Sequence, residues 1–302
     1  MIDLHMHSRQ SDDGEFTPSE LAEKCRESGV ETMSLTDHNT VSGTEEALAA
    51  CRSAGLNFIP GIEIDCSYSG VDFHVLGYGI DWHRPEFRRI EADIAAGYAE
   101  SSMVMLEKVR ALGFDVSTER LDEITADCYW KNRYYPEAFA EALLSDPRYT
   151  DNELLRPFRP GQPKGDNPYF RIFLEWFSQG KACYAPMDYP PVEEIIGIIH
   201  SAGGLAVLAH PGNNLKGHRE LLPELCAMEL DGLEVFSSYH DTEATEYFYG
   251  EVKKRGLYMS CGSDFHGKVK PRIPLGSVKC TREAEDFAAF LCGRSAVVCS
   301  GY

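Results

Sequence analysis

Five widely separated segments of the chain place histidine or carboxylate residues at the end of a short apolar run. They read DLHMH at 3–7, LTDH at 35–38, GIEI at 61–64, LAHPG at 208–212 and GSDFH at 262–266. In a barrel of parallel strands linked by helices, the carboxyl ends of all strands meet at one rim. The recurrence therefore predicts an α/β barrel in which these polar side chains point to one site.

Amphipathic segments with recognisable boundaries separate the apolar runs. In FTPSELAEKCRESGV, Thr17 suits an N-cap, Pro18 the first helical position, Glu20 a capping box and Gly29 a helix stop. After residue 183 the alternation resumes, with VEEIIGIIHSAGG predicted as a helix and LAVLAHPG and GLEVFSS as strands. Strands that alternate with helices are typical of a parallel sheet, so we expect one here.

The middle of the chain has a different composition. Residues 83–182 read as helix and loop, with aromatic and proline-rich stretches such as YWKNRYYPEAF and few β-branched runs. We expect a mostly helical insertion that follows a barrel strand and caps the active site. The barrel itself would then consist of residues 1–82 and 183–302.

Composition limits the classes of partner. The net charge of the 302 residues is −19, from 48 acidic and 29 basic side chains, which argues against binding of duplex nucleic acid. The chain has neither an apolar run long enough to span a bilayer nor a signal-like N-terminus, and its ten cysteines are scattered. We expect a cytoplasmic protein with reduced thiols and no membrane partner.

Six of the ten histidines accompany the predicted strand ends, and carboxylates lie near them. One residue separates His5 from His7, so both rings project from the same face of a strand and could bind one ion. We expect His200 to be structural, and His83 and His218 to be solvated. His240 follows a strand-like run, and it either contacts substrate, as a proton donor, or begins a helix.

The order of the motifs carries a family resemblance. The stretches DLHMHS, SDDG, TDHNTVSG, PGIEI, HVLGYG, GGLAVLAHPG and GSDFHG resemble the successive signatures of the polymerase and histidinol phosphatase (PHP) family of metal-dependent phosphoesterases. The resemblance implies a distorted (β/α)7 barrel, similar to a TIM barrel, that holds two or three divalent metal ions. The insertion resembles that of stand-alone bacterial members related to nucleoside 3′,5′-bisphosphate phosphatases.

The resemblance also implies which side chains hold the metals. The first site would comprise His5, His7, Glu63 and Asp264. The second would share Glu63 and add His74 and His210, and the third would comprise Asp12, His38 and His266. Asp37 would position His38 or a backbone turn. Nitrogen and oxygen ligands without cysteine favour Mn²⁺, Fe²⁺ or Zn²⁺.

Cations outside the metal ligands should bind the substrate. WKNRYYPEAF resembles a stretch that reads arginine-proline-histidine in relatives, with Arg133 at the arginine position. Tyr134, Tyr135 and Pro136 replace the proline and histidine. Lys131 and Lys181 are further candidate substrate-binding residues.

The implied function is hydrolysis of a small phosphate mono- or diester by metal-activated hydroxide. Candidate substrates are a nucleoside bisphosphate, a sugar or polyol phosphate and a cyclic phosphate, with Asp264, Glu63 and His240 as the candidate catalytic residues. The alternatives are a histidinol-phosphate phosphatase and a 5′–3′ exonuclease on short oligonucleotides. A catalytically inactive regulatory domain is disfavoured, because all nine matched positions keep side chains that can bind a metal.

Overall fold

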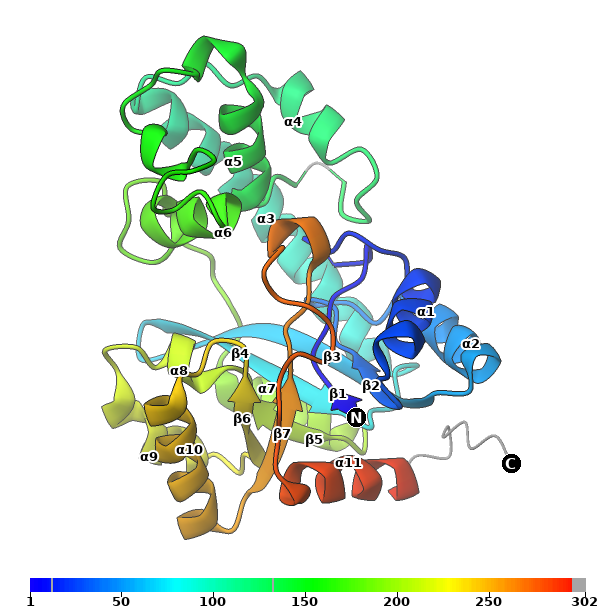
Figure 1. The fold of residues 1–302 in the computed structure, drawn as a ribbon. Helices are drawn as coiled ribbons and strands as arrows, with labels where there is room; N and C mark the ends of the chain where they lie inside the picture. The colour runs from blue at the N-terminus through cyan, green and yellow to red at the C-terminus, as the bar shows by residue number, and fades with distance from the viewer. Residues whose placement is uncertain (12, 132, 295–302) are drawn as a thin grey trace.

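The computed structural model describes residues 1–11, 13–131 and 133–294. Seven strands form one sheet in chain order: β1 (Ile2–Asp3), β2 (Thr32–Leu35), β3 (Asn57–Tyr68), β4 (Val71–Tyr78), β5 (Leu205–Leu208), β6 (Gly232–Ser237) and β7 (Tyr258–Gly262). The first and last strands also meet, because the Leu4 N–H donates to the Cys261 carbonyl and Met6 bridges Phe265. The sheet is therefore nearly closed, which confirms the predicted distorted barrel (Figure 1).

One strand departs from the predicted parallel sheet. β4 runs antiparallel to both β3 and β5. Ser69 and Gly70 connect β3 to β4 with φ values of 51° and 75°, and so short a connection permits only a hairpin. The prediction of a parallel sheet is wrong at this strand. The reversal places His74, near the start of β4, beside the end of β5, where the Ala209 N–H donates to the His74 carbonyl.

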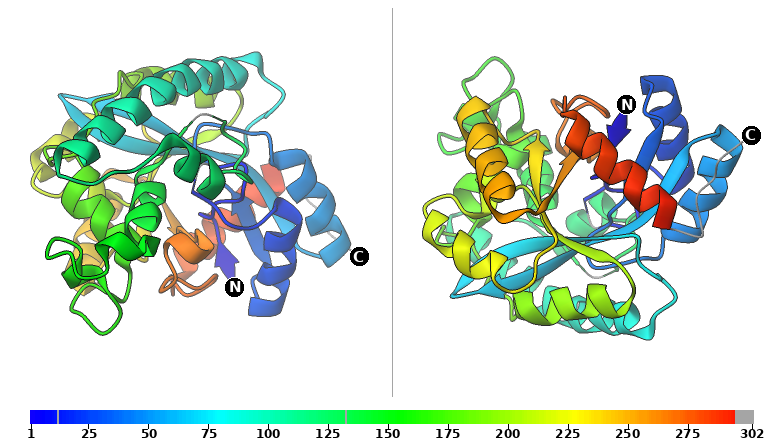
Figure 2. Two further views of the ribbon diagram at one scale, coloured as in Figure 1. Left: turned by 90° about the horizontal axis from the view of Figure 1, so that it is seen from above. Right: turned by 90° about the horizontal axis from the view of Figure 1, so that it is seen from below.

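Helices cover the outside of the barrel. They are α1 (Pro18–Ser28), α2 (Thr44–Ala54), α7 (Val192–Ser201), α9 (Leu222–Cys226), α10 (Thr242–Arg255) and α11 (Arg282–Arg294). The short α8 (Pro211–Asn214) lies at the rim instead, directly after β5. The predicted start of α1 is confirmed: Thr17 and Glu20 form a capping box, and Gly29 ends the helix with φ of 78°. α11 lies across the end of the barrel opposite the insertion, where Phe287 and Leu291 are buried (Figures 1 and 2).

The insertion is helical and stands above the rim of the barrel (Figure 1). It contains α3 (Pro85–Ala111), α4 (Thr118–Ile124), α5 (Pro136–Ser145) and α6 (Pro168–Ile172), together with the short turns η1 (Pro147–Tyr149), η2 (Arg156–Phe158) and η3 (Phe173–Phe177). The described residues from 83 to 182 include no strand. Buried side chains from Met105 to Ala185 give this part an apolar cluster of its own. The domain boundaries at residues 82 and 183 stay a prediction.

None of the helices among the described residues is long and apolar enough to cross a bilayer.

Candidate metal centre

The predicted ligands that the structure describes meet at the rim, beneath the insertion. Their potential ligand atoms form sets within 4.8 Å of one another, and the first set is His5, His7, Glu63 and Asp264, all of them buried. A second set is Glu63, His74 and His210. These two sets match the groupings that the family resemblance implied for the first and second metal.

Glu63 lies between the two sets. Its Oε2 is 2.9 Å from His5 Nε2 and 3.1 Å from His7 Nε2. Its Oε1 is 2.9 Å from His74 Nδ1 and 3.1 Å from His210 Nε2. One carboxylate oxygen thus faces each set, which is the geometry that a bridging ligand requires.

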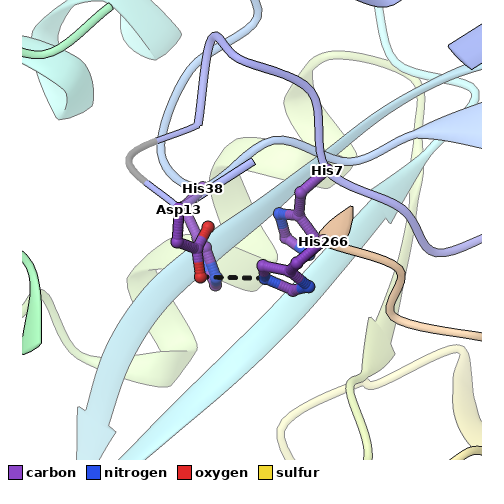
Figure 3. Close-up of side chains that lie close together, drawn as sticks. All are labelled: His7, Asp13, His38 and His266. Carbon is purple, nitrogen blue, oxygen red and sulfur yellow. Dashed lines mark ion pairs between the residues drawn. The ribbon is translucent and has the colours of Figure 1, made fainter. Parts of the chain in front are cut away.

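The third set contains a carboxylate that the sequence did not single out. His7, His38 and His266 gather around Asp13, whose Oδ2 lies 2.9 Å from His266 Nε2 (Figure 3). The predicted ligand Asp12 lies outside the described residues. The sequence indicates a carboxylate in this loop through the adjacent Asp12 and Asp13, and the structure places Asp13 beside the histidines.

Acceptors behind the imidazoles fix their orientation. The outer Nδ1 of His5 is 2.9 Å from Glu234 Oε1, and that of His210 is 2.8 Å from Asn214 Oδ1. His266 Nδ1 donates to the Asp264 carbonyl at 2.8 Å. An acceptor at the outer nitrogen holds the ring proton there and leaves the inner nitrogen with a lone pair for a metal.

Glu234 and Asp65 each contact two of the predicted ligands. Glu234 is fully buried, and its Oε2 also accepts the His210 backbone N–H at 2.7 Å. Asp65 Oδ1 lies 3.3 Å from His74 Nε2 and 3.5 Å from His38 Nδ1. The sequence analysis missed both residues, although a glutamate inside the apolar strand GLEVFSS is a signal that could have found Glu234.

Two buried atoms of the first ligand set have no hydrogen-bond partner among the described residues. They are His7 Nε2 and Asp264 Oδ1, and the two atoms lie 3.0 Å from each other. Unsatisfied buried polar atoms are costly, whereas ligand atoms that share an octahedral cation at about 2.1 Å lie about 3.0 Å apart. The residues therefore fit divalent metal ions.

The charges of the side chains in the centre also favour bound cations. Burial alone would lower the pKa of His5, but the carboxylates of Glu63, Glu234 and Asp264 raise it well above its usual value. Burial alone would raise the pKa of Glu63, but the surrounding imidazoles of His5, His38 and His74 hold it well below its usual value. Metal ions bound by these groups would supply the positive charge that protons otherwise supply.

Two further aspartates shape the backbone. Asp37 accepts hydrogen bonds from the Ser8 N–H and hydroxyl, and burial raises its pKa to about 6. This confirms the prediction that Asp37 positions a backbone turn. Asp3 accepts the N–H groups of Ser263 and Gly276 at 2.9 and 2.8 Å, which ties β1 to the chain after β7.

The centre opens into a cavity of about 700 Å³ between the barrel and the insertion. Arg133 and Lys181 line this cavity, and the buried Arg133 guanidinium lies over the ring of Tyr98. Lys131 is exposed, donates to the Ala126 carbonyl at 2.9 Å and does not line the cavity. The structure therefore brings two of the three predicted cations to the site and leaves Lys131 outside it.

The structure does not bring His240 to the cavity. Its Nε2 accepts the Gly212 N–H and its Nδ1 donates to the Val235 carbonyl, both at 2.8 Å. Both ring nitrogens are thus engaged by backbone groups, and this arrangement does not support contact with substrate or proton donation. His240 does not begin a helix either, because Asp241 is the N-cap of α10. The structural role predicted for His200 is confirmed by its 2.7 Å contact with Asp231.

Sequence analysis also missed two polar side chains beside Asp264. The Tyr239 hydroxyl donates to Asp264 Oδ2 at 2.5 Å, and the Lys270 ammonium donates to the same oxygen at 2.8 Å. Both residues line the cavity.

Comparisons with known proteins agree on one group of enzymes. Residues 3–202 match the family model described as PHP domain. A 3′,5′-nucleoside bisphosphate phosphatase from Chromobacterium violaceum is 30% identical over 88% of this chain and 87% of its own length. A 5′-3′ exoribonuclease from Haemophilus influenzae is 29% identical over 87% of this chain and 89% of its own.

A third relative and a solved structure extend the comparison. A phosphoribosyl 1,2-cyclic phosphate 1,2-diphosphodiesterase from Eggerthella lenta is 30% identical over 90% of this chain and 96% of its own. The structure of an amidohydrolase from Chromobacterium violaceum, with bound sulfate and no metal, superposes with a TM-score of 0.80 at 27% identity. That likeness covers 97% of this chain and 96% of the other.

Proposed function

Because this chain belongs to the PHP family, we propose that it is a metal-dependent phosphoesterase that hydrolyses a small phosphate mono- or diester. The observation that carries the proposal is the position of Glu63, whose two carboxylate oxygens face two overlapping sets of ligand atoms. Such paired sites are typical of enzymes that transfer phosphoryl groups to water.

The proposed roles follow from where the side chains lie. The three ligand sets would hold two or three divalent ions, Mn²⁺, Fe²⁺ or Zn²⁺, with Glu63 as the bridge and Asp13 as the carboxylate of the third set. When bound, these ions would activate water and neutralise charge on the phosphoryl group. Arg133 and Lys181 would bind a phosphate of the substrate from the insertion side of the cavity.

The cavity and the relatives support a small substrate. A volume of about 700 Å³ is in the range of sites for small molecules and cofactors. Two relatives are named for a nucleoside bisphosphate and for a phosphoribosyl cyclic phosphate, both of them small phosphate esters. We therefore propose this class as the substrate.

A 5′–3′ exonuclease is the second candidate, because three relatives are named as 5′-3′ exoribonucleases. The same metal centre could cleave the terminal phosphodiester of a short strand. The net charge of −19 would oppose binding of a long one.

The test is hydrolysis by metal-reconstituted protein across a panel of phosphate compounds. The panel contains nucleoside 3′,5′-bisphosphates, cyclic phosphodiesters, sugar phosphates, histidinol phosphate and short oligonucleotides, and phosphate release and strand shortening are both followed. Selective turnover of a small ester is the expected result. Strand shortening alone would favour the exonuclease, and no turnover at a verified metal content of two or three ions per chain would contradict the proposed function.

A further inference from the structure

Lys270 brings a positive charge into the cavity directly beside the predicted metal ligands. It follows the turn η5 (Gly267–Val269), and only 7% of its surface is exposed. Its Nζ lies 2.8 Å from Asp264 Oδ2 and 3.4 Å from His266 Nε2. Because a buried ammonium is costly unless an anion compensates it, this position requires negative charge nearby.

The two oxygens of Asp264 face different surroundings. Oδ1 lies 3.3 Å from His5 Nε2 and 3.0 Å from His7 Nε2, among the predicted ligand atoms. Oδ2 accepts hydrogen bonds from Lys270 and Tyr239. A metal ion at Oδ1 would share the negative charge of the carboxylate, which would leave the Lys270 ammonium less compensated. A second anion in the cavity would restore the balance.

Aromatic rings hold the ammonium in place. Nζ lies 5.5 Å from the ring centroid of Phe170, in the insertion, and 5.4 Å from that of Tyr239, in the barrel. These cation–π contacts restrict the side chain, and the rings reduce its exposure to water, which strengthens its attraction for an anion. Lys270 also lines the cavity, so an anion that enters can reach it.

We propose that Lys270 binds the phosphoryl group that is hydrolysed, by contact with one of its oxygens next to the metal centre. The inference rests on the proposed function and deepens it, because it assigns a protein cation to the reacting phosphate. Arg133 and Lys181 would then be left to bind another part of the substrate. Lys270 lies within GSDFHGKVKP, where the sequence shows two lysines and does not distinguish between them.

The other lysine of GSDFHGKVKP, Lys268, provides a matched control. Lys268 has a side chain that is 47% exposed, pairs with Glu141 at 3.2 Å and does not line the cavity. The experiment titrates inorganic phosphate into the full-length, metal-loaded protein by calorimetry, for wild type, Lys270→Met and Lys268→Met. Metal content per chain is measured on the same samples, and kcat/KM is measured on the best ester of the panel.

We expect Lys270→Met to weaken phosphate binding and to lower kcat/KM, each by about tenfold or more, as for loss of a charged hydrogen bond. Its metal content should stay unchanged, and Lys268→Met should behave as wild type. An unchanged phosphate affinity would overturn the proposal. Loss of metal from Lys270→Met would also overturn it, because Lys270 would then serve only to hold Asp264.

Two further variants guard against misfolding of Lys270→Met. Lys270→Arg keeps the positive charge and Lys270→Gln removes it, so the arginine variant should bind phosphate about tenfold more tightly. Equal affinities of these two variants would overturn the proposal. A wild-type protein that binds phosphate through Lys270 and hydrolyses no ester of the panel would contradict the proposed function alone, because phosphate binding is measured without turnover.

Discussion

At the scale of single residues, the centre depends on side chains that never need to touch a metal. Glu234 lies behind His5 and beneath the backbone of His210, so one carboxylate orients ligands from two sets. Asp264 is itself a predicted ligand, because its Oδ1 lies among the inner nitrogens of the first set. Arg133 has a third role, because it lies in the cavity and outside the ligand sets.

Asp264→Asn should remove a charged ligand while it keeps the size of the side chain. We expect turnover to fall by about two orders of magnitude or more and the metal content to drop by about one ion per chain, because a neutral amide is a weak ligand. Atomic emission spectroscopy and the rate of phosphate release check this, with circular dichroism as the control for folding. Retained activity would exclude Asp264 as a ligand.

Glu234→Gln should weaken metal binding without removing any ligand. The amide cannot match the carboxylate as an acceptor for His5, and loss of such a partner typically costs about 10–100-fold in metal affinity or activity. Metal titration in competition with a chelator measures the effect. The exposed Glu243 on α10 gives the control Glu243→Gln, which should bind metal like wild type; equal affinities for both variants would contradict the positioning role.

Arg133→Ala should act on substrate and leave the metals in place. The loss of a charged hydrogen bond to phosphate is worth about 1.5–3 kcal/mol, so kcat/KM should fall by about tenfold or more. Steady-state kinetics on the best ester checks this. Kinetics identical to those of wild type would remove Arg133 from the substrate site.

At the scale of elements, close approach of the first and last strands closes the barrel. A Cβ at Gly262 in β7 would lie 2.2 Å from His5 Cβ and 2.7 Å from the His5 nitrogen. Only glycine therefore lets β7 pack this close to the segment that carries two predicted ligands. The ligands after two strands also need unusual backbone, because His210 follows β5 with φ of 25° and Asp264 follows β7 with φ of 57°.

Gly262→Ala should therefore disturb both the fold and the centre. We expect the free energy of unfolding to fall by about 1–3 kcal/mol, the usual cost of overpacking, and metal affinity to fall with it. Urea denaturation and metal titration measure the two effects. Gly250 lies within α10 with no neighbouring atom in reach of an added Cβ, so Gly250→Ala should be neutral or stabilising by up to about 1 kcal/mol. Equal stabilities of the two variants would contradict this account of barrel closure.

At the scale of the whole molecule, the metal centre joins segments from both ends of the chain. His5 and Asp264 approach within 3.3 Å across almost the full length of the sequence. Any cation bound there must therefore stabilise the closed barrel against the unfolded chain, because the unfolded chain does not hold these ligands together.

Removal of metal with a chelator should thus abolish turnover and lower the melting temperature. Stabilisation by a ligand at about 100 times its Kd is about 2.7 kcal/mol, and each kcal/mol is worth about 2–4 °C for a chain of this size. Thermal melts across a series of metal concentrations measure the shift, and added metal should restore both properties. A melting temperature independent of metal would contradict a centre that bridges the barrel.

The sequence by itself determined the type of fold and the chemistry of the site. His5 and Asp264 could be identified because the period of the apolar runs locates strands, and polar residues that follow them mark the rim. The expectation that Glu63 also ends a strand was wrong, because β3 continues past it to Tyr68. The cap at Thr17 and Glu20 was equally readable, because capping depends on neighbours in the chain.

Only the tertiary structure decided which groups surround those ligands. Glu234, Asp65 and Lys270 gain their roles from contacts with residues distant in the sequence or from the turn that carries them, and spacing along the chain does not encode such contacts. The direction of β4 depended on a two-residue turn, and the exclusion of His240 and Lys131 depended on hydrogen bonds to the backbone, one of which joins His240 to the distant Gly212. The pattern of apolar residues along the chain locates the strands. Closure of the barrel brings distant segments together and so determines which side chains surround the predicted ligands.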